Sequence, residues 1–123
     1  MKSTHPSADC SALAGRWTIQ AAYRGGEQLD EPAYLQFEGC TFQRVSGEEV
    51  WQRDIVLDDT HQPKWMTIYP QSDPYRGKTL LGIYKIEGDT LYIAHAAPGK
   101  DRPTAFTSPE DTEQVLSIST KQP

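Results

Sequence analysis

Three features are missing from this 123-residue sequence: a long hydrophobic run, a cluster of lysine and arginine, and a helical periodicity longer than one turn. No stretch approaches the roughly 18 apolar residues that a membrane-spanning helix needs. The net charge of −5, without a basic cluster, argues against nucleic acid and anionic membrane surfaces as binding partners. The first residues lack the apolar core of a signal peptide, which predicts a cytoplasmic location.

Cysteine is also scarce, because the chain has only two, Cys10 and Cys40. The pair allows one disulfide, but Cys10 lies in a polar segment, and this favours two free thiols. Neither His-x-His nor Cys-x-x-Cys occurs, so we expect no metal and no other cofactor. A nucleophile elbow, a phosphate loop and a zinc-protease motif are lacking too, which removes the best-defined classes of enzyme site.

Turn-forming and aromatic residues are well represented. Glycine and proline each occur nine times, and aromatic residues make up 10% of the chain. This composition is typical of many short strands separated by turns rather than of long helices. Residues 1–11 are polar and show no periodicity, which predicts a flexible N-terminal leader. Residues 12–123 form one predicted domain with a single core.

A predicted β-hairpin organises the chain. Its two alternating segments, Thr79–Ile86 and Thr90–Ala96, are joined by Glu87–Asp89, in which Gly88 suits a tight turn. Successive side chains of a strand point to opposite faces, so each segment has one face that turns inward. The predicted inward residues are Leu80, Gly82, Tyr84 and Ile86 in the first segment and Leu91, Ile93 and His95 in the second.

Apolar and polar residues alternate along most of the remaining chain as well. Residues 11–14 are expected to form a helical turn that plugs one end, and Glu27–Ala33 an exposed crossing. Eight or nine short strands that close on themselves leave no free edge, so we predict an all-β, antiparallel, up-and-down barrel. The other predicted strands are 15–24, three within 34–57, 64–70, a short one around Ala105 and Phe106, and 114–119.

Two stretches carry a family resemblance that covers roughly residues 13–119. Gly15-Arg16-Trp17 resembles the GxW motif of lipocalins. The block GKTLLGIYKIEGDTLYIA, followed by PGKDRPTAF, resembles a family of small uncharacterised lipocalin-like domains common in planctomycetes. The resemblance implies a calycin-type barrel with a cavity for one small, mostly apolar molecule. It also implies that an arginine from late in the chain packs across Trp17, and Arg102 is the candidate.

The inward faces suggest how such a cavity would be lined. Alternation in the first strand places Trp17, Ile19, Ala21 and Tyr23 on one face. Tyr23, Tyr84 and His95 would then be polar points on an apolar wall, which is the usual form of a small-molecule site. The alternative is a solid core, in which these polar groups bond to the backbone.

His95, Tyr84 and Tyr23 are also the candidates for acid–base chemistry, because an unperturbed imidazole titrates near pH 6.5. A structural role for His95 is the alternative. Trp51 and Arg53 share one face of their strand, and both faces of that strand mix apolar and charged residues. If Arg53 points inward, it needs an anion such as Asp54, Glu38 or a ligand carboxylate. An outward or rim position is favoured.

An exposed aromatic patch is predicted at Trp65, Tyr69 and Tyr75, which would suit a protein interface or the lip of the pocket and leaves a homodimer open. The leading functional hypothesis is the binding of a small hydrophobic or aromatic metabolite in the barrel cavity. One alternative is a small barrel enzyme, a cyclase, isomerase or hydratase, that acts on a biosynthetic intermediate. A second alternative is a filled barrel that serves as an interaction or inhibitor module.

Overall fold

The computed structural model describes residues 8–29, 32–73 and 75–122, and the described chain forms nine β-strands and one short helix. The helix is α1 (Ala8–Leu13). The strands are β1 (Gly15–Arg24), β2 (Glu27–Leu29), β3 (Tyr34–Glu38), β4 (Thr41–Ser46), β5 (Glu49–Asp58), β6 (Lys64–Pro70), β7 (Leu80–Glu87), β8 (Thr90–His95) and β9 (Val115–Lys121).

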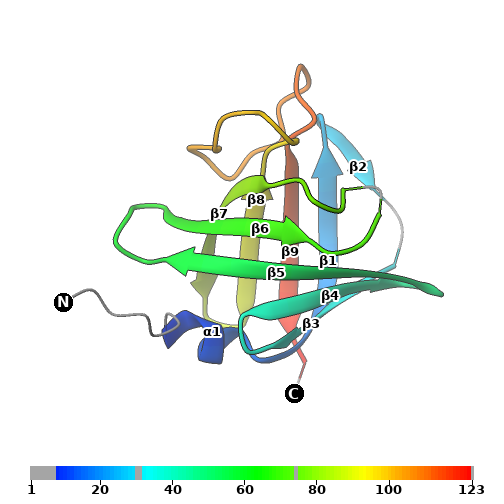
Figure 1. Ribbon diagram of the computed structural model, residues 1–123, viewed down its shortest axis with the longest axis vertical. Coiled ribbons are helices and arrows are strands. Elements are labelled where there is room, and N and C mark those ends of the chain that lie inside the picture. The colour runs from blue at the N-terminus through cyan, green and yellow to red at the C-terminus, as the bar shows by residue number, and fades with distance from the viewer. Residues whose placement is uncertain (1–7, 30–31, 74, 123) are drawn as a thin grey trace.

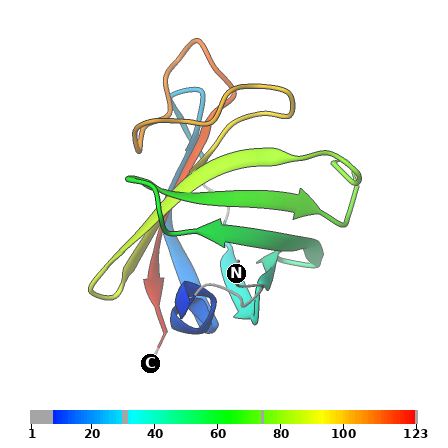
Figure 2. The same cartoon turned by 60° about the vertical axis from the view of Figure 1, so that its left-hand side comes forward.

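The strands close into a barrel. Strands β1, β3, β4, β5, β6, β7, β8 and β9 are neighbours in that order, and β9 pairs back onto β1 (Figures 1 and 2). Every pairing is antiparallel. The prediction of an all-β, antiparallel, up-and-down barrel is therefore confirmed, with eight strands in the closed ring and β2 as an extra strand beside the end of β1.

Two segments differ from the sequence prediction. The chain around Ala105 and Phe106 is a bend rather than a strand. Phe106 packs instead edge-on against the Tyr92 ring, with ring centroids 6.2 Å apart. Strand β2 lies where an exposed crossing was expected, because Gly25 and Gly26 take φ values of 59° and 82° and turn the chain back onto β1.

Helix α1 closes one end of the barrel, as Figure 1 shows at the bottom of the molecule. Leu13 is fully buried in the core, and its carbonyl accepts a 2.8 Å hydrogen bond from Nε1 of Trp17. The helical turn predicted at residues 11–14 is thus part of a helix that begins at Ala8. The boundary predicted at residue 11 for a flexible leader falls inside this helix, and residues 1–7 lie outside the described chain.

A disulfide joins Cys10 in α1 to Cys40 in the β3–β4 turn, with Cα atoms 5.2 Å apart. The expectation of two free thiols is therefore wrong. Sequence alone could not place the two residues together, because the closeness arises from the barrel, which brings the β3–β4 turn to the end that α1 covers (Figure 1). The disulfide fastens the helix across that closed end.

The hydrophobic core occupies the half of the barrel next to α1. Trp17, Phe37 and Tyr84 are its largest fully buried side chains. Phe37 stacks on Phe42 across β3 and β4 with ring centroids 4.7 Å apart. Because these large side chains fill the closed half, they form the floor of the interior space in the other half of the barrel.

Candidate functional site

A cavity of about 370 Å³ occupies the half of the barrel away from α1. This volume lies in the range of about 300–1,000 Å³ that is typical of small-molecule sites. Its floor is apolar, and its polar groups stand nearer the mouth, at the ends of β1, β4, β5, β8 and β9. The lining residues that matter below are Ala22, Arg24, Phe42, Arg44, Glu49, Trp51, Arg53, Tyr75, His95 and Ser117.

A register shift in β1 changes which residues face this cavity. Pairing with β9 shifts between Ile19 and Ala21, so Gln20 has no partner of its own on β9. Such a bulge reverses the alternation beyond it. Ala22 is buried on the cavity wall and Tyr23 is not among the lining residues. The prediction that Ala21 and Tyr23 point inward is therefore wrong.

Tyr84 also lies away from the cavity. Its side chain is fully buried in the core of the closed half. Gly82, two residues earlier, has its Cα against the neighbouring strands, because a Cβ there would come within 2.8 Å of the Ala94 carbonyl oxygen. The prediction that Tyr84 lines the cavity is wrong. Alternation correctly predicts that Tyr84 points inward, but it cannot tell whether an inward side chain packs in the core or borders the cavity.

Trp51 and Arg53 line the cavity, so of the favoured outward or rim positions the outward one is wrong for Arg53. The opposite face of β5 is the outer one, with Val50 and Val56 48% and 57% exposed. Across the sheet, Trp51 pairs with Arg44 of β4 and Arg53 pairs with Phe42 of β4. The side chains of these four residues form one wall of the cavity.

The guanidinium of Arg53 lies in an unfavourable setting. Its Nε is buried and has no hydrogen-bond partner within the described chain. Burial lowers the pKa of Arg53 to about 10, and the charges of Arg44 and Arg24 act in the same direction. An arginine keeps its charge at that pKa, so a partly buried cation stands in the cavity wall, and its buried Nε has no bonded partner within the described chain.

His95 lies on the opposite wall, at the end of β8, where it lines the same cavity. Burial and, next to it, the charge of Arg53 lower its pKa to about 3. Nδ1 lies 3.4 Å from the carbonyl oxygen of Ala96. His95 is therefore neutral at physiological pH, and its pKa lies far from the range in which an imidazole exchanges protons efficiently.

Arg24, Arg44 and Tyr75 line the cavity, although none of them was among the predicted site residues. Uninterrupted alternation would put Arg24 on the face opposite Trp17 and Tyr23, and the bulge in β1 brings it to the cavity instead. Arg44 shares a face with Phe42, and this spacing was a usable signal. Tyr75 was expected in an exposed patch with Trp65 and Tyr69, but the loop that follows β6 places it at the cavity.

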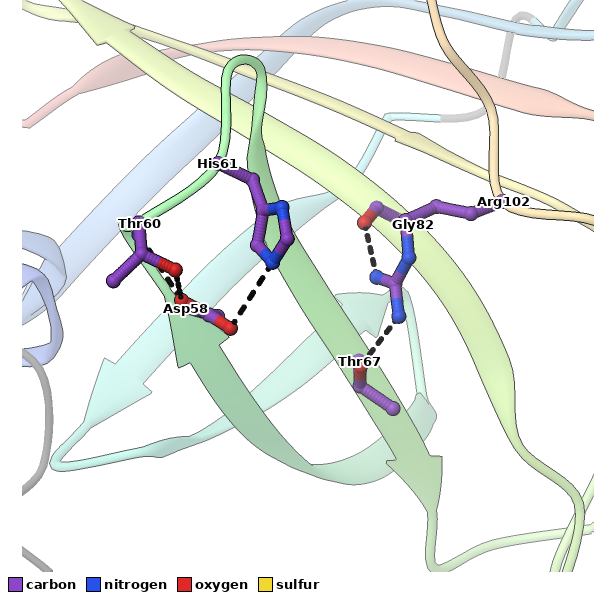
Figure 3. Close-up of polar contacts among 6 residues, drawn as sticks. All are labelled: Asp58, Thr60, His61, Thr67, Gly82 and Arg102. Atoms are coloured by element: carbon purple, nitrogen blue, oxygen red, sulfur yellow. Dashed lines mark hydrogen bonds and ion pairs between the residues drawn. The ribbon is translucent and has the colours of Figure 1, made fainter. Parts of the chain in front are cut away.

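Arg102 lies on the outside of the barrel and does not contact Trp17 as the family resemblance implied. Its guanidinium donates 2.7 Å and 3.1 Å hydrogen bonds to the Gly82 carbonyl oxygen and to Oγ1 of Thr67 (Figure 3). It also lies 4.2 Å from the centroid of the Trp65 ring. The cation over Trp17 is instead Nζ of Lys121, at 5.1 Å.

Trp65 is held between two partners on the outer surface. The His61 ring stacks on it with centroids 3.4 Å apart, and Arg102 covers it as well. His61 in turn lies 3.4 Å from a carboxylate oxygen of Asp58 (Figure 3). Trp65 is therefore not part of a continuous aromatic patch with Tyr75, and this prediction is wrong.

Within the residues that the structure describes, no group of three or more histidine, cysteine, aspartate or glutamate side chains could hold a metal ion. The same part of the chain has no helix with the length and apolar character needed to cross a membrane. Comparison with known proteins found no matching family model, no similar curated protein and no similar solved structure.

Proposed function

We propose that this protein binds a small hydrophobic or aromatic metabolite inside its barrel, in the manner of a lipocalin-like carrier. The observation that carries the proposal is the cavity of about 370 Å³, which combines an apolar floor with a few polar side chains near the mouth. Sites of this form are the common way in which proteins enclose small molecules. The eight-stranded ring is consistent with a lipocalin-like barrel, and the family assignment is part of the proposal.

The two alternatives have less support. A filled barrel is incompatible with a cavity of this size. An enzyme would need an acid or base, and His95, its best candidate, has a pKa of about 3. Efficient proton transfer at neutral pH calls for a pKa nearer the working pH. A homodimer stays a prediction, and its support is limited to exposed side chains such as Val56 and Tyr69 on the outer face of β5 and β6.

The disulfide bears on where the protein works. Disulfides persist mainly in oxidising compartments and are rare in the cytosol. The Cys10–Cys40 bond therefore favours an oxidising compartment, in place of the cytoplasm that the sequence predicts. Thiol labelling of protein recovered from each compartment decides between them. An intact Cys10–Cys40 bond in protein from the oxidising compartment supports that location, and free thiols in protein from the cytoplasm support the other.

A pair of neighbouring substitutions tests the proposed binding. Ala22 faces the cavity and Ala21 does not. We expect Ala22→Phe to fill part of the cavity and to weaken binding of the neutral fluorescent probe N-phenyl-1-naphthylamine by about tenfold or more, which corresponds to the loss of about 1.4 kcal/mol. The matched variant Ala21→Phe should bind the probe as the wild type does.

The measurement is a fluorescence titration of each protein, with thermal unfolding as a check that both variants fold. Absence of probe binding to the wild type would overturn the proposed function. Equal loss of binding in both variants would place the probe somewhere other than the cavity.

A further inference from the structure

We infer that the molecule bound in this cavity is an organic anion, with a carboxylate or similar planar oxyanion on Arg53 and an apolar body against the cavity floor. This inference rests on the proposed function, because it names the ligand chemistry of the same site. It follows from the partly buried cation of Arg53 with its buried, unpartnered Nε, from the balance of charge in the lining, and from the arrangement of aromatic side chains around the arginines.

Arg53 needs an anion that the described chain does not supply. Burial of an ionised group without a partner is costly, so such groups normally have a counter-charge. Glu38 and Asp54 are exposed on the outer faces of β3 and β5, and Glu49, which lies on the cavity side of β5, is exposed as well. The Nε donor of Arg53 is buried without a hydrogen-bond partner. A ligand oxyanion in the cavity would satisfy both requirements.

The lining has the opposite charge balance to the protein as a whole. The chain carries 17 acidic and 12 basic residues. Among the lining residues that the structure describes, three are arginines, Arg24, Arg44 and Arg53, and one is a carboxylate, Glu49. A concave site with low-dielectric walls concentrates the potential of its charges. An anion is therefore attracted to this cavity although the protein is acidic.

The aromatic side chains suit a flat apolar group next to that anion. Arg44 lies 5.0 Å from the centroid of the Trp51 ring and Arg53 lies 5.8 Å from the centroid of the Phe42 ring. Guanidinium and aromatic groups thus alternate on the wall formed by β4 and β5. A guanidinium is planar and bonds a carboxylate through two parallel donors, so a ring that carries a carboxylate can lie along this wall.

Two small probes of the same shape test the inference. We expect the wild-type protein to bind 2-naphthoate at least about tenfold more tightly than 2-naphthalenemethanol, because charge-assisted hydrogen bonds are the stronger ones. The Arg53→Met variant should lose most of this preference and keep its affinity for the alcohol. Arg16→Met is the matched control, since Arg16 also lies over an aromatic ring, Tyr34, at 4.0 Å, but outside the cavity.

Isothermal titration calorimetry gives both affinities for each protein. Equal affinity of the wild type for the two probes would overturn the inference and leave the proposed function standing. Binding of neither probe would overturn the proposed function itself. An Arg53→Met variant that folds and keeps the full preference would also overturn the assignment of the oxyanion to Arg53. If that variant does not fold, the preference of the wild type decides alone.

Discussion

At the scale of single residues, the cavity is a place where ionisation is expensive. Arg53 remains charged there, whereas His95 gives up its proton, and both have lowered pKa values for the same first cause, which is burial. The two groups differ because the guanidinium starts from a pKa of 12.5 and the imidazole from 6.5. A neutral imidazole facing a cation avoids adding a further positive charge to the wall.

The depressed pKa of His95 predicts a pH dependence of stability. In the unfolded chain His95 takes up a proton near pH 6.5, and in the folded protein only near pH 3. Its contribution to stability is therefore present above pH 6.5 and is lost as the pH falls from 6.5 toward 3, by up to about 1.4 kcal/mol per pH unit. Among the described residues, the charged or titratable groups that line its surroundings are Arg24, Arg44, Glu49, Arg53, Tyr75 and Glu113.

Urea unfolding of the wild type and of His95→Gln at several pH values isolates this term, because the carboxylates contribute equally to both. We expect the wild type to lose stability more steeply than the variant between pH 6.5 and pH 4. Parallel curves for the two proteins would show that His95 ionises in the folded state as it does in the unfolded state.

At the scale of elements, the strands that were predicted well are those whose alternation is uninterrupted. Segments Thr79–Ile86 and Thr90–Ala96 correspond closely to β7 and β8, and Gly88 takes the positive φ of 61° that their turn needs. Strand β1 was found with its correct bounds. The side-chain directions beyond Gln20 were not predictable, because nothing in the composition of β1 marks the bulge.

Strand β5 shows a different limit. Its two faces both mix apolar and charged residues, so alternation could not say whether Arg53 or Val56 points outward. The register of strand pairing determines which face of β5 points inward. Arg53 is paired with the buried Phe42 of β4, so both side chains lie on the inner face. The fold was therefore predictable from local pattern, and the cavity wall required the pairing of strands.

Helix α1 depends on its disulfide, which predicts a large effect of its removal. The bond joins residues 30 positions apart and so restricts the unfolded chain. We expect the Cys10→Ser, Cys40→Ser double variant to lose about 3–4 kcal/mol of unfolding free energy. Guanidinium denaturation without reductant measures the difference. A variant as stable as the wild type would show that helix packing alone holds α1 in place.

At the scale of the whole molecule, the barrel has a packed half and a hollow half. Leu13, Trp17 and Tyr84 fill the half beside α1, whereas the other half encloses the cavity. Regions with few buried apolar contacts open locally at a lower free energy than packed regions do. The rigidity of the molecule should therefore be graded along the barrel axis.

Amide hydrogen exchange tests this gradient. Without ligand, we expect the amides of Trp17 and Leu91 in the packed half to exchange slowest, and those of Arg44 and Trp51 near the β4–β5 turn to exchange at least about tenfold faster. Saturation with 2-naphthoate should slow exchange mainly in the second pair. Uniform protection along the barrel, with or without the probe, would contradict this description.

The bulge at Gln20 has a consequence for how this barrel can diversify. The unpaired residue Gln20 decides which side chain at the end of β1 faces the interior, the phenol of Tyr23 or the guanidinium of Arg24. Gain or loss of a single residue there exchanges a neutral group for a cation at the mouth while β4 and β5 stay unchanged. A shift in spacing at this point would therefore change the charge at the mouth of this barrel with no substitution in β4 or β5.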